Sequence, residues 1–194
     1  MTEKEKSHLG LLYDAANKPG ELLDERIRGK DLCYEYNHLR PSQMEERKKI
    51  IKELIGTIHG DFFIEQPFTC DYGYNIEIGE NFYSNHNLII LDATKVTFGD
   101  NVFIAPSCGF YTAGHPLDVE RRNSGLEYAY PITVGNNVWI GGNVIVMPGV
   151  NIGDGCVIGA GSVVTKDIPS GVLAYGNPCR VKRQITEEDK KKYI

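Results

Sequence analysis

Hydrophobic positions in the second half of the chain recur every six residues. One series consists of Val134, Ile140, Val146, Ile152, Ile158 and Val164, and a second, offset by four, of Val138, Val144, Val150, Cys156 and Ser162. A period of six fits neither an amphipathic helix nor an alternating strand. It is typical of a parallel β-helix, in which each short strand is one face of a coil and glycine or asparagine turns the corner.

The same pattern is present earlier in the chain. It runs through Tyr72, Ile78, Ser84 and Ile90, and after a shift of two residues through Phe98, Ile104 and Phe110. The shift predicts an irregular corner around residues 92–95. The pattern is lost over residues 111–131, which we expect to form a long excursion loop, and such loops on a rigid scaffold often carry function.

The first part of the chain has a helical pattern. Pro19 precedes an imperfect apolar stripe of helical period, and Ser42 with Glu45 has the spacing of a capping box before a second stripe. We therefore expect a helical segment over residues 1–60, a β-helix over 61–185 that includes the loop, and a short helical tail over 186–194.

Charge and cysteine content narrow the range of functions. The 194 residues carry a formal net charge of −5, which argues against nucleic acid or a membrane surface as partner. The five cysteines form no C-x-x-C pair, and no signal peptide or long apolar run is evident. We expect a reduced, soluble, cytoplasmic protein. A local basic cluster of Lys166, Arg180, Lys182 and Arg183 is compatible with an anionic ligand or with an ordinary solvated face.

Several motifs together resemble the hexapeptide-repeat acyltransferases, and specifically the maltose and galactoside O-acetyltransferase group. They are ELLDERIRGK, FTCDYGYNIEIGENFYSNHN, TAGHP, PITVGNNVWIGGNVIVMPGV, IGAGSVVTKDIP and GNPCRVKR, and they cover nearly the whole chain. The resemblance implies a left-handed parallel β-helix, acetyl-CoA as co-substrate, no metal requirement, and homotrimers with active sites between subunits.

The resemblance implies roles for two catalytic side chains. His115 in TAGHP would be the general base that accepts the proton of an acceptor hydroxyl. Asn85 would help to orient that hydroxyl and the histidine, although asparagine is also a normal corner residue. His86 is the only other histidine in a matching segment, and we interpret it as part of the site wall or as structural.

The resemblance also assigns residues to the two substrates. The acceptor sugar would contact Asp14, Arg26, Asp71, Asn85 and Glu127. Acetyl-CoA would contact Trp139, Gly141, Gly142, Gly159, Ala160, Thr165, Lys166, Arg180 and Arg183, with the Gly142 N–H as oxyanion donor. Repeat geometry alone explains most of the glycines. Ala93 stands where some members carry a second acidic residue, which leaves the preferred glycoside open.

Three functions are compatible with these observations. We favour transfer of an acetyl group to a sugar hydroxyl of the maltose, glucose or galactoside type. A second alternative is an antibiotic or other small-molecule O-acetyltransferase of the same fold. A loop after Phe110 more hydrophobic than the one in this chain would favour that alternative. A non-catalytic β-helical scaffold would need neither TAGHP nor the basic cluster. Zinc binding finds little support in the histidine spacing.

Overall fold

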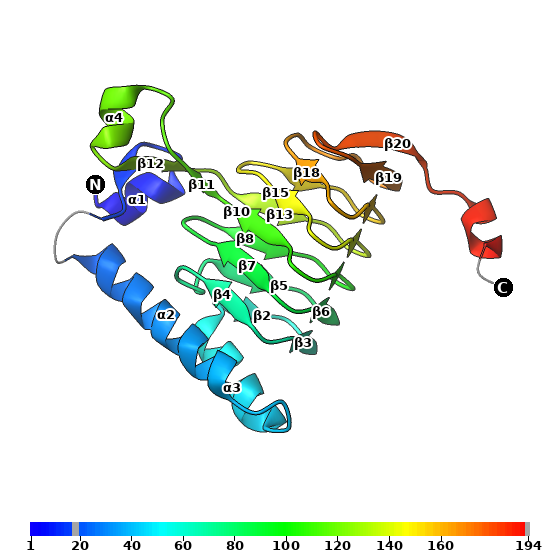
Figure 1. The fold of residues 1–194 in the computed structure, drawn as a ribbon, viewed down its shortest axis with the longest axis horizontal. Helices are drawn as coiled ribbons and strands as arrows, with labels where there is room; N and C mark the ends of the chain where they lie inside the picture. Colours follow the sequence, from blue (N-terminus) through cyan, green and yellow to red (C-terminus); the bar gives the residue numbers. More distant parts are fainter. Residues whose placement is uncertain (17–19, 193–194) are drawn as a thin grey trace.

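The computed structural model describes residues 1–16 and 20–192, and most of them form a parallel β-helix (Figure 1). Its strands are very short, and the chain visits three faces in turn before it starts the next coil. The first face consists of β4 (Phe68–Cys70), β7 (Leu88–Leu91), β10 (Gly109–Tyr111), β15 (Ile145–Val146) and β18 (Val163–Val164). The second face consists of β2 (Thr57–Ile58), β5 (Ile76–Ile78), β8 (Val96–Phe98), β13 (Ile132–Val134) and β16 (Asn151–Ile152).

The third face is the longest, and it ends in the only antiparallel pairing of the coil body among the described residues. It consists of β3 (Phe62–Ile64), β6 (Phe82–Ser84), β9 (Phe103–Ile104), β14 (Trp139–Ile140), β17 (Val157–Ile158), β19 (Val172–Tyr175) and β20 (Arg180–Gln184). The last strand, β20, folds back antiparallel on β19. A short 3-10 helix, Glu187–Lys191, follows it and lies at the far end of the molecule from the N-terminal helices.

The interior confirms the six-residue pattern. Ile140, Ile158 and Val164 are completely buried, as are the other members of both series to within a few per cent. In the lower coils the rings of Phe82, Phe98 and Phe110 meet edge to face with centroids 5.2 and 4.9 Å apart. Each such side chain contributes about 1.5–3 kcal/mol when it leaves water, and stacking of coils is what buries it.

Three of the turns between coils show how polar residues hold neighbouring coils in register. We call the turns between the second and third faces, residues 79–81, 99–101 and 135–137, the far corner. There Asn81, Asn101 and Asn137 adopt positive φ values of 55–56°, a conformation that asparagine tolerates. The carboxylate of Asp100 accepts a hydrogen bond from the Glu80 N–H of the coil below at 2.8 Å.

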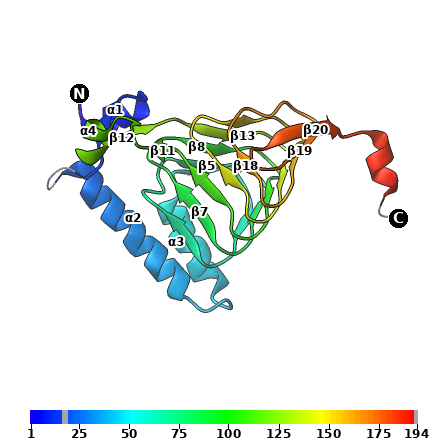
Figure 2. The ribbon, with the colours of Figure 1, turned by 45° about the horizontal axis from the view of Figure 1, so that its top comes forward.

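Two helices, α2 (Glu21–His38) and α3 (Met44–Leu54), cover the lower end of the β-helix, and α2 packs against α3 and β4 (Figure 2). Helix α1, Glu3–His8, lies instead beside the excursion (Figure 1). The capping box predicted at Ser42 is wrong, because α3 begins one residue later with Gln43 as its N-cap. The Gln43 side chain instead accepts the Arg40 N–H at 3.0 Å. Pro19, expected to start α2, lies outside the described residues.

The excursion leaves the β-helix after β10 and returns at β13. It contains β11 (Ala113–Gly114), helix α4 (Val119–Asn123) and β12 (Leu126–Ala129). Strand β12 pairs antiparallel with both β11 and the N-terminal strand β1, Tyr13–Asp14. The excursion thus lies beside α1 (Figures 1 and 2). No helix within residues 1–16 and 20–192 is long and apolar enough to cross a membrane.

Candidate active site

His115 directly follows β11, and its imidazole is exposed. Its Nδ1 atom lies 3.0 Å from the carbonyl oxygen of Leu126 on β12. A carbonyl oxygen can only accept, so this hydrogen bond requires the proton of a neutral imidazole to be on Nδ1. The Nε2 atom then carries the lone pair, which is the state a general base needs.

Strand pairing brings two of the predicted acceptor residues to the same place. In the β1–β12 register Asp14 is opposite Leu126 and Tyr13 is opposite Glu127. The Tyr13 hydroxyl donates to Glu127 Oε2 at 2.7 Å. Asp14 accepts the N–H of Ala16 at 3.0 Å. Asp14, Glu127 and His115 are therefore carried by adjacent strands of one small sheet.

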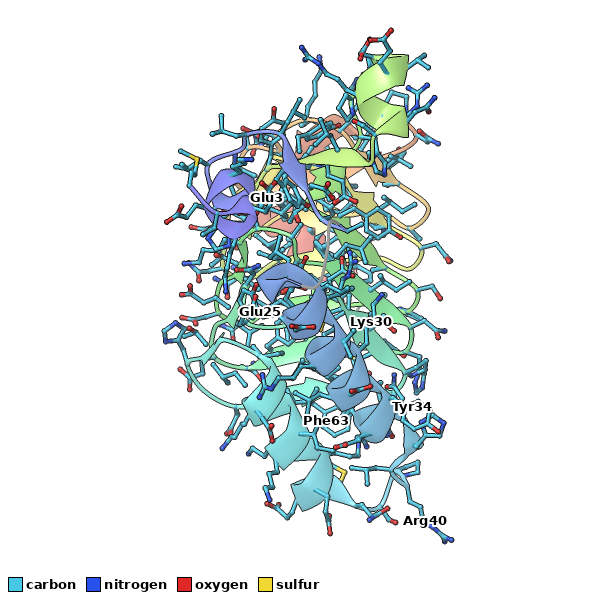
Figure 3. All side chains as sticks on the ribbon, turned by 90° about the vertical axis from the view of Figure 1, so that its left-hand side faces the viewer. Glu3, Glu25, Lys30, Tyr34, Arg40 and Phe63 are labelled. Carbon is cyan, nitrogen blue, oxygen red and sulfur yellow. The ribbon has the colours of Figure 1, made fainter. Side chains whose placement is uncertain are left out.

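Asp71 and Arg26 belong to the same cluster. Burial raises the pKa of the Asp71 carboxyl, and the negative charge of Glu127 raises it further, while the positive charges of Arg26 and Lys30 oppose this shift. Arg26 and Lys30 are on α2, one turn apart; Figure 3 looks onto this helix and labels Lys30. The site thus combines three acidic side chains, Asp14, Asp71 and Glu127, with two basic ones.

An apolar wall closes the cluster. A small hydrophobic core separate from that of the β-helix consists of Tyr13, Ala15, Leu22, Tyr72, Ala93 and Ala129, with Tyr74 and Ala113 packed against it. Burial raises the pKa of the Tyr13 phenol, and the neighbouring Glu127 charge raises it further, so this tyrosine remains a hydrogen-bond donor. Carboxylates beside an apolar wall suit a ligand with hydroxyl groups on one side and C–H groups on the other.

Asn85 lies at another corner of the β-helix. It follows β6 on the third face, in the turn toward the first face, whereas His115 leaves from the end of the first face. Its Oδ1 accepts the N–H of His86 at 2.7 Å. The His86 imidazole lies 2.6 Å from the Gln66 carbonyl oxygen through Nδ1. A single chain therefore does not bring Asn85 to His115.

The predicted coenzyme residues occupy four regions. Trp139 points outward from the third face with 54% of its surface exposed. Gly141, Gly142, Gly159 and Ala160 lie at the same corner as Asn85, the one between the third and first faces. Thr165 and Lys166 follow β18, and Arg180 and Arg183 are exposed on β20.

Stacking explains two of these glycines. A Cβ at Gly141 would lie 2.6 Å from the Ala160 nitrogen, and one at Gly159 would lie 2.7 Å from the Tyr175 Cβ. Neither position tolerates a side chain, with or without a ligand. Gly142 differs, because its Cβ would come no closer than 3.4 Å to another atom, the Pro106 carbonyl oxygen.

Arg183 already has an acidic partner in this structure. Its guanidinium forms two hydrogen bonds with the Asp189 carboxylate in the 3-10 helix, at 2.6 and 2.7 Å. These bonds, together with the Thr186 N–H, hold the pKa of Asp189 well below its usual range. A phosphate at Arg183 would therefore bind next to a carboxylate.

Comparison with known proteins identifies the family. Residues 6–60 match the maltose acetyltransferase hexapeptide capping motif, and residues 131–166 match the bacterial transferase hexapeptide, a model of six repeats. The chain is 53% identical to the galactoside O-acetyltransferase of Escherichia coli K12 over 173 residues, which are 89% of this chain and 85% of that protein. The chain belongs to the hexapeptide-repeat acetyltransferases of the maltose and galactoside group.

Solved structures of the same group superpose on nearly the whole chain. A galactoside acetyltransferase in complex with coenzyme A gives a TM-score of 0.95 at 49% identity, covering 100% of this chain and 96% of that one. A maltose O-acetyltransferase from Clostridium difficile 630 gives 0.92 at 50% identity, covering 96% and 99%. The expected β-helix and acetyltransferase family are thereby confirmed.

The structure adds three residues to the candidate site that sequence reasoning missed, because Tyr13, Lys30 and Tyr72 lie in or against the acidic cluster. Ala93, which the sequence singled out, is buried in the apolar wall at 5% exposure. Tyr13 could have been noticed as the neighbour of Asp14, but nothing in the sequence shows that it pairs with Glu127.

The cysteines of the acetyltransferase are all free and buried. Cys108 and Cys156 are inward core residues, as the repeat predicted. Among the described residues no group of three or more histidine, cysteine, aspartate or glutamate side chains is arranged to hold a metal ion.

Proposed function

We propose that the chain transfers the acetyl group of acetyl-CoA to a hydroxyl of a sugar of the maltose, glucose or galactoside type, with His115 as general base. The observation that carries this proposal is the 3.0 Å hydrogen bond between His115 Nδ1 and the Leu126 carbonyl oxygen. It leaves Nε2 as the acceptor atom on an exposed ring beside a cluster of carboxylates.

In the proposed reaction the hydroxyl oxygen attacks the thioester carbonyl carbon while its proton moves to His115 Nε2. The Gly142 N–H donates to the oxygen on which negative charge develops. The carbon–sulfur bond then breaks, and the imidazolium returns its proton to the sulfur. The products are the acetyl ester and free coenzyme A thiol, so no further reactant is needed.

The acceptor would bind between the acidic cluster and its apolar wall. Asp14, Asp71 and Glu127 offer acceptor oxygens to sugar hydroxyls, and Arg26 offers donors. Tyr13 holds Glu127 in place through the 2.7 Å bond. The alternation of polar edges and an apolar face in a pyranose ring matches this arrangement better than a largely apolar antibiotic.

The donor side would be completed by a second copy of the chain. Asn85 and Gly142 lie at one corner of the β-helix and His115 lies at another, so one chain cannot place them around one substrate. We infer a homotrimer in which each site combines the His115 corner of one subunit with the Asn85 corner of its neighbour. Lys166, Arg180 and Arg183 would then meet the coenzyme phosphates.

We also infer that the enzyme acts in the cytoplasm. Its proposed donor is a cytoplasmic metabolite, and its five cysteines are unpaired thiols.

Thiol release from acetyl-CoA tests the proposal. Wild type is assayed with glucose, maltose, a galactoside and chloramphenicol, each beside a sample without acceptor. Sugar-dependent release above the rate without acceptor supports the proposal and ranks the sugars. Release with chloramphenicol alone would replace the sugar by an antibiotic, and no release despite acetyl-CoA binding would contradict this acceptor class.

A further inference from the structure

Asp92 is a buried acid at the irregular corner that follows β7, and the reaction proposed above gives it no role. Its side chain is completely buried. Oδ1 accepts the N–H groups of Asp71 at 3.0 Å and Tyr72 at 2.9 Å, and Oδ2 accepts that of Gly73 at 2.7 Å. Three successive amides therefore form a small anion-binding cradle, and the carboxylate that fills it belongs to the next coil.

The segment held by Asp92 has little freedom on its other sides. A Cβ on Gly29 of α2 would lie 2.6 Å from the Asp71 carbonyl oxygen, so the helix backbone runs directly against this segment. Gly73 has a φ of 80°, and a side chain there would collide with the Leu54 carbonyl. On its amide side the segment is held by the Asp92 carboxylate.

We propose that Asp92 is a positioning residue for the acceptor, which it orients by fixing the backbone that carries Asp71. This inference rests on the proposed role of Asp71 in acceptor binding. Asp71 faces Arg26, Lys30 and Glu127, so a small rotation of its backbone would change which of these it meets. Misplacement of a binding group by about 1 Å can lower catalytic efficiency by about 100-fold.

Carboxylates at other turns make a weaker version of the same contact. Asp100 accepts one N–H, that of Glu80, and Asp154 accepts one, that of Asn136, at 2.8 and 2.7 Å. Both residues are exposed. Asp92 differs in being buried, in using both oxygens and in accepting from three consecutive residues, the first of which is in the acceptor cluster.

Steady-state kinetics of Asp92→Ala and Asp100→Ala provide the first test. Both variants remove a carboxylate that accepts backbone N–H groups of another coil. Asp100 is the control because it lies at the far corner and not in the acceptor cluster. We expect Asp92→Ala to raise the acceptor KM by about tenfold or more while the acetyl-CoA KM stays within about twofold, and Asp100→Ala to change neither. Equal increases in both KM values for Asp92→Ala would show general damage and overturn the proposal.

Coupling to Asp71 separates a positioning role from a purely structural one. In an Asp71→Asn background, Asp92→Ala should lower acceptor kcat/KM much less than it does in wild type, because there is no carboxylate left to orient. Additive losses would overturn the proposal. If Asp71→Asn itself leaves the acceptor KM unchanged, it is the role of Asp71 in the proposed function that fails.

Amide hydrogen exchange covers the case in which Asp92→Ala does not fold or no acceptor is found. Asp92→Asn keeps one oxygen for Asp71 and Tyr72 and replaces the oxygen facing Gly73. We expect faster exchange at the Gly73 amide, which loses its acceptor in this variant, and unchanged exchange at the Glu80 amide. Unchanged exchange at Gly73 would overturn the proposal, whatever the activity of the enzyme.

Discussion

His115 and Leu126 are joined across the excursion by a hydrogen bond of 3.0 Å between the imidazole Nδ1 and the carbonyl oxygen. The bond fixes both the orientation of the ring and the nitrogen that remains available. Because the excursion makes this contact within itself, the ring is held in this orientation before any substrate binds.

Replacement of His115 by alanine should lower kcat by about 10² to 10⁴, the usual contribution of general base catalysis. The melting temperature should stay close to wild type, since the side chain is exposed. His38→Ala is a matched control, because His38 also places Nδ1 against a backbone carbonyl, 2.7 Å from Tyr34, but lies at the end of α2. Normal turnover in His115→Ala would exclude the histidine as base.

Tyr13→Phe should raise the acceptor KM by about tenfold or more and leave the acetyl-CoA KM unchanged. The substitution removes only the donor to Glu127, and a hydrogen bond to a charged group is worth about 1.5–3 kcal/mol. Tyr34→Phe, on the exposed side of α2, should have no effect. Initial rates at varied acceptor concentration measure both variants, and an unchanged acceptor KM in Tyr13→Phe would remove Glu127 from the acceptor site.

Asp92 should make the wild-type protein less stable as pH rises from about 4 to about 7. Burial raises its pKa from 3.8 to about 7, against the opposing effect of the hydrogen bonds from Tyr72 and Gly73. In this range the folded state holds a proton that the unfolded state releases, so the unfolding free energy falls by about 1.4 kcal/mol per pH unit from this group. Urea unfolding at several pH values should show that the unfolding free energy of Asp92→Asn lacks this dependence on pH. If the unfolding free energies of both proteins change equally with pH, the prediction is contradicted.

Gly141 and Gly142 should respond differently to alanine. The Gly141 Cβ would lie 2.6 Å from the backbone of the next coil, so Gly141→Ala should cost about 1–3 kcal/mol of unfolding free energy. Gly142→Ala has room at 3.4 Å and should melt within a few degrees of wild type. Thermal unfolding of the two variants compares them directly. Equal decreases in melting temperature would refute the explanation that stacking of coils requires glycine at position 141.

The inferred trimer predicts a single species of about three chain masses by light scattering. Leu117 in the excursion is 95% exposed in the single chain, and a large apolar side chain in that position suits contact with another subunit. Leu117→Ser should weaken the assembly and lower activity at low protein concentration. Met44→Ser, at an exposed apolar position at the start of α3 and away from both corners, should change neither. A fully active wild-type monomer would contradict a site shared between subunits.

The repeat made the β-helix predictable because each inward position is occupied by a small set of apolar residues at a fixed spacing. Val134 through Val164 follow this rule without exception, and the shift near Asp92 correctly marked an irregular corner. The capping-box spacing was a less reliable guide at α3, where the N-cap residue is Gln43 and not Ser42.

The acceptor side of the site was predictable only as separate residues. Tyr13 and Glu127 are 114 positions apart, and each belongs to a strand too short to have a pattern. Their pairing depends on where the excursion returns to the N-terminal segment. The sequence likewise could not predict that the amides of Asp71, Tyr72 and Gly73 bind a carboxylate, because nearly every residue type has the same backbone N–H group.

Most of the proposed acceptor residues come from β1, α2 and the excursion, with Asp71 and Asn85 in coil turns as the exceptions, whereas most of the coenzyme candidates are within the repeating coils. Substitutions in β1, α2 or the excursion therefore leave the register of the coils untouched. Recognition of the donor can stay constant while the acceptor changes, so one architecture can serve many hydroxylated compounds, with new specificities arising from the nonrepetitive segments of the chain.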